Sequence, residues 1–322
     1  MSIKLGNLDV ESFKVGSGDC SIYLGTTLLY SGGTPPAPHD YSQDYLTVRA
    51  LGSGDVKWSG SRNGTTINKL SYSTDGGSTW STPSSSITIS VNSGDTVLFK
   101  GECTPISRSP YGIGKFSGTT ASFVVEGNPM SLLYGDDFSG QTSLSGKNYA
   151  FYDLFSSCVS LVSAENLSLP ATTLAYACYY AMFSSCSNLA TAPELLATTL
   201  AEQCYQYMFF NCSSLETAPE LQATILSNRC YRHMFRGCTS LTTAPELPAT
   251  TLTTEGYYWM FYGCTSLSSI TCLATDIYAT SCTKDWVSGV AASGTFTTPS
   301  STSWTTGNNG IPNGWTRVDY SS

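Results

Sequence analysis

The sequence has few charged side chains and almost no histidine. Only 12% of its 322 residues are Asp, Glu, Lys or Arg, and two are His, whereas about 25% charged residues is usual in soluble proteins. No stretch is long and apolar enough to predict a membrane-spanning helix. The chain also lacks the loop motifs of nucleotide-binding proteins, the serine elbow of hydrolases and the histidine pairs of zinc enzymes. These absences favour a non-enzymatic protein without cofactor, metal or membrane insertion.

The charge that is present is predominantly negative. A formal net charge of -8 disfavours nucleic acid and anionic membranes as partners. A hydrophobic content of 41% predicts a folded chain, and the abundance of Gly, Ser, Thr and Tyr predicts a β-rich, hydroxyl-covered surface. Residues 1–6 lack the charged start and apolar run of a secretory signal, so we expect no signal peptide.

The dominant feature is an internal repeat with a period of 26 residues. The segment at 178–186 returns at 204–212 and 230–238, and it returns at 256–264 with glycine in place of the first cysteine. A fixed period between about 20 and 50 residues is typical of solenoids, whose units bury apolar surface only against their neighbours. The sequence therefore predicts repeats between residues 136 and 282.

Each nine-residue unit has five nearly invariant positions and four variable ones. With Cys178 numbered as position 0, the invariant positions are 0, 1, 4, 5 and 8. At about 100° per residue these lie on one side of a helix. We therefore predict a short helix in each unit with its invariant side buried, then a turn-and-strand half from Leu189. The expected fold is multi-domain and β-rich, with an α/β solenoid of about five coils.

The pattern Met-Phe-x-x-Cys-x-x-Leu at this period resembles the BspA-type leucine-rich repeats of bacterial surface proteins. The resemblance covers residues 149–282 and departs from the common form in its Ala-Pro-Glu-Leu segments. It implies an adhesive or recognition protein and not an enzyme. The longer pattern is also similar to repeat proteins of gut Bacteroides species and their bacteriophages, which often open with short glycine-rich segments such as residues 3–6 and 22–25.

Most of the 12 cysteines fall into two columns of the repeat. The first contains Cys178, Cys204, Cys230 and Cys282; the second contains Cys158, Cys186, Cys212, Cys238 and Cys264. A column of small buried residues suits the interior of stacked coils, where a free thiol packs as a small hydrophobe. We therefore expect reduced cysteines, and no cysteine or histidine spacing predicts a zinc site.

The remaining segments divide the chain further. Residues 1–32 contain short alternating runs, too few for an independent core, and are predicted to be an N-terminal β anchor that binds another subunit or a β-ribbon packed on the next domain. Residues 33–39 are a proline-rich linker. Residues 40–135 alternate as in a β-sandwich-like domain, and residues 283–322, with three tryptophans, are expected to form a C-terminal cap. The same tryptophans could instead stack on sugars.

One turn in the predicted sandwich matches the Asp-box pattern of sialidases. Residues 73–80 read Ser-x-Asp-x-Gly-x-Thr-Trp, and the resemblance is confined to this single copy. We interpret it as structural, with Asp75 accepting backbone hydrogen bonds, Gly77 supplying an unusual φ and Trp80 packing beneath the turn.

A second candidate for chemistry is the carboxylate column Glu194, Glu220 and Glu246. Its members would stand about one coil apart, near the separation of a retaining glycosidase pair. A repeated Pro-Glu-Leu is explained more simply by turn chemistry, so we expect no catalytic residues.

The variable side of the repeat is the predicted ligand-binding surface, because aromatic and arginine side chains dominate binding hot spots. The residues concerned are Tyr207, Phe210, Arg232, His233, Arg236, Tyr258, Trp259 and Tyr262. The alternative is that these positions drift freely, facing water or a neighbouring subunit.

These features and the resemblance favour a bacteriophage virion surface protein, in a head or tail fibre or decoration. It would be anchored to capsid or tail proteins through residues 1–32 and would bind a host-surface glycan or protein. A homo-oligomer, such as the trimer common among fibres, is expected. The alternatives are a bacterial cell-surface adhesin of the BspA type and a purely structural decoration protein of the virion.

Overall fold

The computed structural model describes residues 39–59, 69–84, 86–104 and 113–321, together with the backbone of five strands that precede them. The chain divides into two compact units, Met1–Asp40 and Tyr41–Ser322. The boundaries predicted near residues 135 and 282 both fall inside the second unit.

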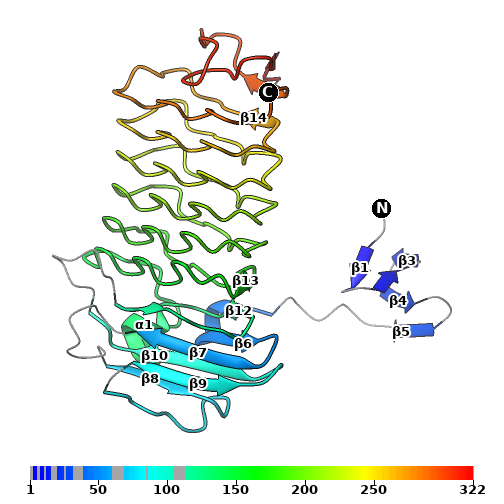
Figure 1. The fold of residues 1–322 in the computed structure, drawn as a ribbon, viewed down its shortest axis with the longest axis vertical. Helices are drawn as coiled ribbons and strands as arrows, with labels where there is room; N and C mark the ends of the chain where they lie inside the picture. The colour runs from blue at the N-terminus through cyan, green and yellow to red at the C-terminus, as the bar shows by residue number, and fades with distance from the viewer. Residues whose placement is uncertain are drawn as a thin grey trace. The chain divides into compact units, whose positions relative to one another are not determined.

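The first unit contains short antiparallel strands (Figure 1). β1 (Ile3–Leu5) pairs with β2 (Leu8–Val10), and β4 (Cys20–Leu24) lies between β3 (Ser12–Val15) and β5 (Thr27–Ser31). The side chains of the predicted anchor and residues 33–38 of the predicted linker lie outside the described residues, so the anchoring role stays a prediction.

The second unit begins with η1 (Tyr41–Gln43) and two sheets. The larger sheet has the order β13-β12-β6-β10-β8, with strands Leu161–Ser163, Phe123–Glu126, Leu46–Ala50, Thr96–Gly101 and Leu70–Ser73. The smaller sheet has the order β11-β7-β9, with strands Lys115–Phe116, Gly54–Ser59 and Ile87–Val91.

Aromatic side chains fill the space between these two sheets. Alternate residues of β6 and β10 are buried, as expected for strands with one face on a core. The ring of Trp58 in β7 lies 6.3 Å from that of Phe99 in β10 and 4.9 Å from that of Phe116 in β11. The two sheets therefore share one apolar core.

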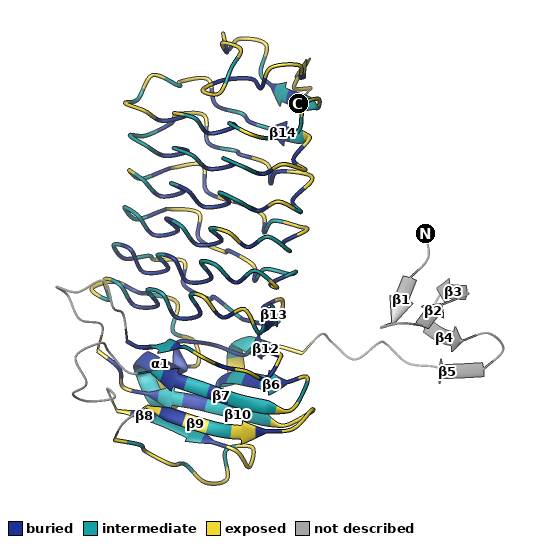
Figure 2. Cartoon of the chain, in the orientation of Figure 1, coloured by how far each residue is buried: buried dark blue, intermediate teal, exposed yellow. Residues whose placement is uncertain are grey.

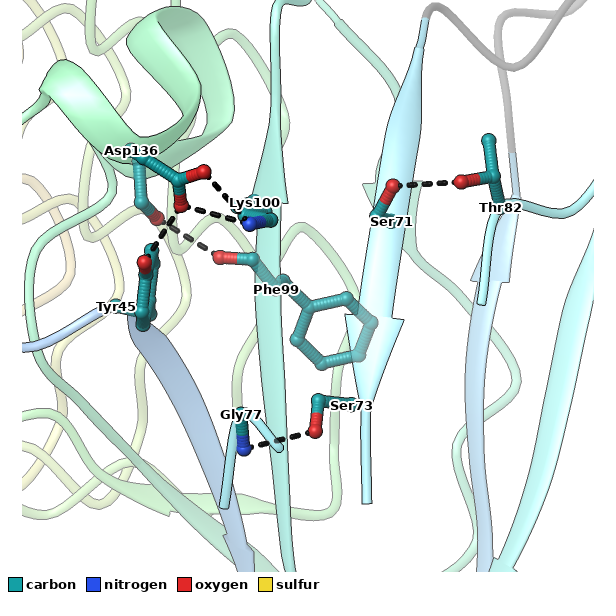
Figure 3. A network of polar contacts seen from close by, with 9 residues as sticks. Tyr45, Ser71, Ser73, Gly77, Thr82, Phe99, Lys100 and Asp136 are labelled. Atoms are coloured by element: carbon teal, nitrogen blue, oxygen red, sulfur yellow. Dashed lines mark hydrogen bonds and ion pairs between the residues drawn. The ribbon is translucent and has the colours of Figure 1, made fainter. Parts of the chain in front are cut away.

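A short helical segment connects this core to the repeats. It consists of α1 (Ser131–Tyr134) and η2 (Gly135–Asp137). The Asp136 carboxylate accepts hydrogen bonds from the Tyr45 hydroxyl (2.6 Å) and the Lys100 ammonium group (2.7 Å), as Figure 3 shows. The Ser131 hydroxyl donates to the Phe99 carbonyl at 2.9 Å. These bonds fix the segment against β6 and β10.

The predicted fold class, a leucine-rich-repeat solenoid of strands and helices, is wrong. Among the described residues the single α-helix is α1, which lies before the repeats, and the described sheets are small and form no such solenoid. None of the predicted helices at 178–186, 204–212, 230–238 or 256–264 is present. Between residues 142 and 290 the chain instead runs through stacked coils that consist almost wholly of turns (Figure 1).

The backbone conformation explains why no helix forms. In the turn-rich part of each coil every fourth residue has positive φ, as Ala177 (50°), Ala181 (52°) and Ser185 (61°) do, and this conformation interrupts a right-handed helix. The N–H of Ser184 donates to Ala181 within the coil at 3.0 Å, whereas the N–H of Phe183 donates to Met208 of the next coil at 3.0 Å. N–H groups thus alternate between turns and the neighbouring coil, which satisfies the buried backbone without helix or long strands.

Stacked aromatic rings form the interior of the coils. Phe155, Phe183, Phe209, Phe235 and Phe261 lie above one another with centroids 5.5 to 5.7 Å apart and ring planes within 7° of parallel. The five invariant positions of the repeat are buried in every coil, as the sequence predicts, although a series of turns and not a helix places them there. Figure 2 shows these buried stretches recurring from coil to coil.

A second stack runs beside the first and continues into the C-terminal segment. It passes from Tyr179 through Tyr205, Tyr231 and Tyr257 to Trp286. β14 (Ser269–Thr271), β15 (Thr295–Thr298) and β16 (Thr316–Asp319) pair in parallel there. Trp286, Trp304 and Trp315 are at most 9% exposed, so these rings lie in the core and do not form an open sugar platform.

The thiols of the second cysteine column join adjacent coils. The Sγ–H of Cys212 donates to the carbonyl of Phe183 at 3.1 Å, and Cys186, Cys238 and Cys264 repeat this contact with the phenylalanines of their preceding coils. Burial raises the pKa of Cys212 to about 12. A buried neutral thiol is a poor nucleophile, because the thiolate is the reactive form.

We therefore expect the native protein to resist thiol reagents. All eleven described cysteines are free and buried, and only the side chain of Cys20 lies outside the described residues. Iodoacetamide at pH 8 should label at most Cys20 in the native chain and all 12 cysteines in guanidinium chloride, as counted by mass spectrometry. Rapid labelling of several repeat cysteines in the native state would contradict this arrangement.

Candidate binding face

The eight predicted ligand-binding residues lie on the outer side of three consecutive coils. We call them the aromatic face: Tyr207, Phe210, Arg232, His233, Arg236, Tyr258, Trp259 and Tyr262. Each is next to at least one buried residue in the turn-rich part of its coil. Seven are partly exposed and one, His233, is buried.

Three of these residues have an uncommon backbone conformation. Tyr207, His233 and Trp259 stand at the same position of successive coils with φ values of 59°, 59° and 53°. Bulky side chains seldom adopt positive φ. The coil geometry imposes it here, since each of their N–H groups donates to the next coil. The aromatic rings are therefore held in a fixed column.

The rings of the aromatic face contact one another across the coils. The His233 imidazole stacks on Tyr207, with centroids 4.4 Å apart and planes 10° from parallel, and lies 5.1 Å from Trp259. Trp259 in turn lies 5.0 Å from Tyr262 with an interplanar angle of 26°. The sequence pattern predicts these residues on one side of the repeat, and the structure shows their rings in contact with one another.

Two arginines lie over these rings. The Arg236 guanidinium is 4.5 Å from the Trp259 centroid, 5.0 Å from Tyr262 and 5.4 Å from Phe210. The Arg232 guanidinium lies 4.9 Å from the Tyr258 centroid. Cations at such distances from aromatic faces are attracted by the ring quadrupole. The face thus carries guanidinium groups as well as aromatic rings.

Acidic residues neutralise part of this charge at one edge. Arg229 Nε donates to Glu255 at 2.8 Å and Arg229 Nη1 lies 3.5 Å from Glu202. Arg232 Nε is 3.5 Å from the same Glu255 carboxylate. Arg236 forms no ion pair with any of the residues that the structure describes.

His233 is held in its neutral form. Burial of the imidazole, followed by the neighbouring Arg232 and Arg236 guanidinium groups, lowers its pKa to about 3. Its Nδ1 is buried without a hydrogen-bond partner among the described atoms. His233 therefore contributes an uncharged flat ring to the face at neutral pH and does not act as a proton carrier there.

The aromatic face extends further toward the N-terminus than the sequence analysis predicted. Tyr180 lies 5.5 Å from Tyr207 and stacks on Tyr152 at 4.8 Å, and Tyr149 contacts both Tyr152 and Tyr176. The sequence analysis did not align the first, atypical repeat with the others, because its spacing differs. The β-bridge between Ser143 and Thr173 joins residues 30 apart, whereas the bridge between Thr173 and Thr199 joins residues 26 apart.

The three Asp-box residues lie in the turn after β8, away from the repeats. Asp75 accepts hydrogen bonds from the Thr79 hydroxyl (2.6 Å) and the Thr79 N–H (2.9 Å), which lower its pKa to about 2. Gly77 has a φ of 92° and its N–H donates to the Ser73 hydroxyl (Figure 3). Trp80 packs on Tyr45 at 5.0 Å and beneath the Lys100 ammonium group. These contacts hold the turn together.

Two members of the carboxylate column line a groove that contains no residue of the aromatic face. Glu194 and Glu220 are exposed and, with Glu165, line a groove of about 410 Å³ beside Pro193 and Pro219. Glu246 does not line this groove. Among the described residues no group of three His, Cys, Asp or Glu side chains is placed to hold a metal ion.

No protein-family model matches this chain, and neither a curated protein nor a solved structure shows significant similarity to it. The resemblance to BspA-type repeats therefore stays a prediction from the sequence motif. Within the described part of the chain, no helix has the length and apolar character needed to span a membrane.

Proposed function

We propose that this chain is a non-enzymatic bacteriophage virion surface protein that binds a host-surface glycan or protein through the aromatic face. Its place would be in a head or tail fibre or decoration. Attachment to capsid or tail proteins through residues 1–32 and assembly into a homo-oligomer, such as a trimer, belong to the same proposal. The observation that carries it is the contact network of rings and guanidinium groups on one side of three coils.

The network is not needed to fill the core, and this supports a binding role. The coils have interior stacks of phenylalanine and tyrosine, all buried. The aromatic face is a further layer outside those stacks, and seven of its eight members keep contact with solvent. Clustered exposed aromatic side chains promote aggregation unless a partner covers them. Aromatic and arginine residues also provide most of the energy at binding hot spots.

The first test removes the two adjacent rings Trp259 and Tyr262. The double variant Trp259→Ala with Tyr262→Ala should bind bacteria from the source culture about tenfold or more weakly, because truncated hot-spot aromatics each cost about 1 kcal/mol or more. Binding of the fluorescently labelled chain is measured by flow cytometry.

The matched control is Tyr278→Ala. Tyr278 is 87% exposed and belongs to no contact of the aromatic face, so its loss should leave binding unchanged. Equal binding by the native chain and the double variant would reject the aromatic face as the binding surface.

The virion location is tested separately. Electron microscopy and mass spectrometry of particles purified from the same culture should find the chain on the particle, with residues 1–32 against capsid or tail protein. Recovery with the bacterial envelope, and from no particle, would instead support an adhesin of the BspA type.

A further inference from the structure

Most basic residues of the repeats lie on the aromatic face and its edge. Between residues 142 and 290 the chain has ten acidic residues and five basic ones. Lys147 lies over the ring of Tyr134, which does not belong to the face, and the other four are Arg229, Arg232, Arg236 and Lys284. Arg232, Arg236 and Lys284 lie over rings of the face, and Arg229 is linked to it through Glu255. A protein of net charge -8 thus gathers most of the basic side chains of its repeats at one place, where Glu202, Glu255 and Asp285 offset part of their charge.

Arg236 has the donor groups that a ligand could use. The centre of its guanidinium lies 4.5 to 5.4 Å from the centroids of three rings, an arrangement that occupies the face of the group and leaves its in-plane N–H donors directed elsewhere. No described residue accepts a hydrogen bond from this side chain, and its nitrogens are not among the buried atoms that lack a partner. Solvent therefore reaches these donors.

The chemistry of this guanidinium suits an anionic oxygen group such as a carboxylate. Its planar donors match the two oxygens of a carboxylate, and such charge-assisted pairs are among the strongest polar contacts. Trp259 and Tyr262 stack on one another beneath it, with centroids 5.0 Å apart and planes 26° from parallel. Both residues are partly exposed, so they present apolar surface next to the charge. A sugar ring that carries a carboxylate presents both an apolar C–H face and an anionic edge.

We infer that the aromatic face binds saccharides that bear a carboxylate, of the uronic or sialic acid type, with Arg236 pairing the carboxylate and Trp259 and Tyr262 stacking on the sugar. This inference rests on the proposed binding function. The inference specifies the ligand class: the face binds acidic polysaccharides more tightly than their neutral counterparts.

The test compares each acidic polymer with its carboxyl-reduced counterpart. The probes are polygalacturonate, alginate, hyaluronate and polysialic acid, with binding to the full chain measured by calorimetry at low and high salt. At least one acidic polymer should bind about tenfold tighter than its reduced form, and the difference should shrink at high ionic strength.

Three variants assign the effect to Arg236. Arg236→Met should bind both forms of the polymer equally. Arg236→Lys, which keeps the positive charge, should lose most of the discrimination because it lacks the planar donors. Arg317→Gln makes the same change in net charge as Arg236→Met at an exposed position of β16 outside the face, and it should discriminate as the native chain does.

The outcomes separate the two claims. If both forms of a polymer bind equally, and Trp259→Ala with Tyr262→Ala abolishes that binding, the aromatic platform stands and the inference of an acidic ligand is overturned. If no acidic polymer binds, the inference is also overturned, and the flow cytometry experiment decides the proposed function independently. Thermal unfolding of each variant checks that a loss of binding is not a loss of fold.

Discussion

Phe209→Ala is expected to lower the free energy of unfolding by about 3–5 kcal/mol, the usual cost of truncating a fully buried phenylalanine. Phe209 is 0% exposed and its ring lies between those of Phe183 and Phe235, at 5.5 and 5.7 Å. Removing it leaves a cavity in the middle of the stack, where both neighbouring rings are fixed by their own coils and cannot collapse into the gap. Urea unfolding followed by circular dichroism measures the loss.

The adjacent residue provides a matched control. Phe210 is also a phenylalanine in the same coil, but it is partly exposed and contacts Tyr207 and Arg236 on the aromatic face. Phe210→Ala should cost about 1 kcal/mol, as expected for a half-buried side chain. Similar losses for the two variants would mean that the phenylalanine stack is not the main source of stability in the coils.

His233→Tyr is expected to make the protein markedly more resistant to acid. The folded-state pKa of His233 is lowered to about 3 by burial and by Arg232 and Arg236, whereas its unfolded pKa is near 6.5. As the pH falls from 6.5 toward 3, the unfolded chain binds a proton that the folded chain does not, so the native protein loses stability. At pH 4 this loss is about 3 kcal/mol, since each pKa unit corresponds to about 1.4 kcal/mol.

Tyrosine is the appropriate replacement because the coils already accept aromatic side chains at this position. Tyr207 occupies it in the preceding coil and Trp259 in the following one, both with positive φ. The two proteins should differ little at pH 7.5, and the variant should be more stable by about 3 kcal/mol at pH 4. The carboxylates titrate in both chains, so the difference between their urea unfolding curves isolates the histidine. Parallel pH profiles would contradict the lowered pKa.

The repeat shows what could and could not be predicted from sequence. The period of 26 residues and the buried positions follow from identity of side chains alone, because a residue that recurs in every unit has the same environment in each. The predicted helix in each repeat was wrong because the backbone conformation in this segment repeats every four residues. Over nine residues a period of four and the helical period of 3.6 differ by about one residue, so the pattern fits both.

The feature that the sequence does not predict is the backbone conformation of the coils. Positive φ at Ala177, Ala181 and Ser185 is not suggested by those residue types, since alanine and serine favour right-handed conformations. The stacking of coils imposes it, through N–H groups that reach the next coil. Contacts between segments a full period apart cannot be predicted from a local stretch of sequence. The pairing of β12 with β13 was not predicted for the same reason.

The candidate face was easier to predict than the fold. Position in the repeat was enough to place Arg236, Trp259 and Tyr262 on one side, whether a helix or a series of turns presents them. The sequence analysis predicts neither the burial of His233 nor that Arg236 has no acidic partner among the residues that the structure describes. Both depend on which side chains of adjacent coils lie within a few ångströms, and so on the exact register between coils.

The hydrogen bond from each Cys Sγ–H to the phenylalanine of the preceding coil has a consequence for how such a chain can change length. Cys212 donates to Phe183 and Cys238 to Phe209, and Cys186 and Cys264 make the same bond, so the same junction recurs between successive coils. A 26-residue block removed from this series or inserted into it would leave a junction of the same kind, because these contacts recur at every step. The number of coils, and with it the height of the aromatic face, can therefore vary between related chains in whole steps while the ends stay unchanged.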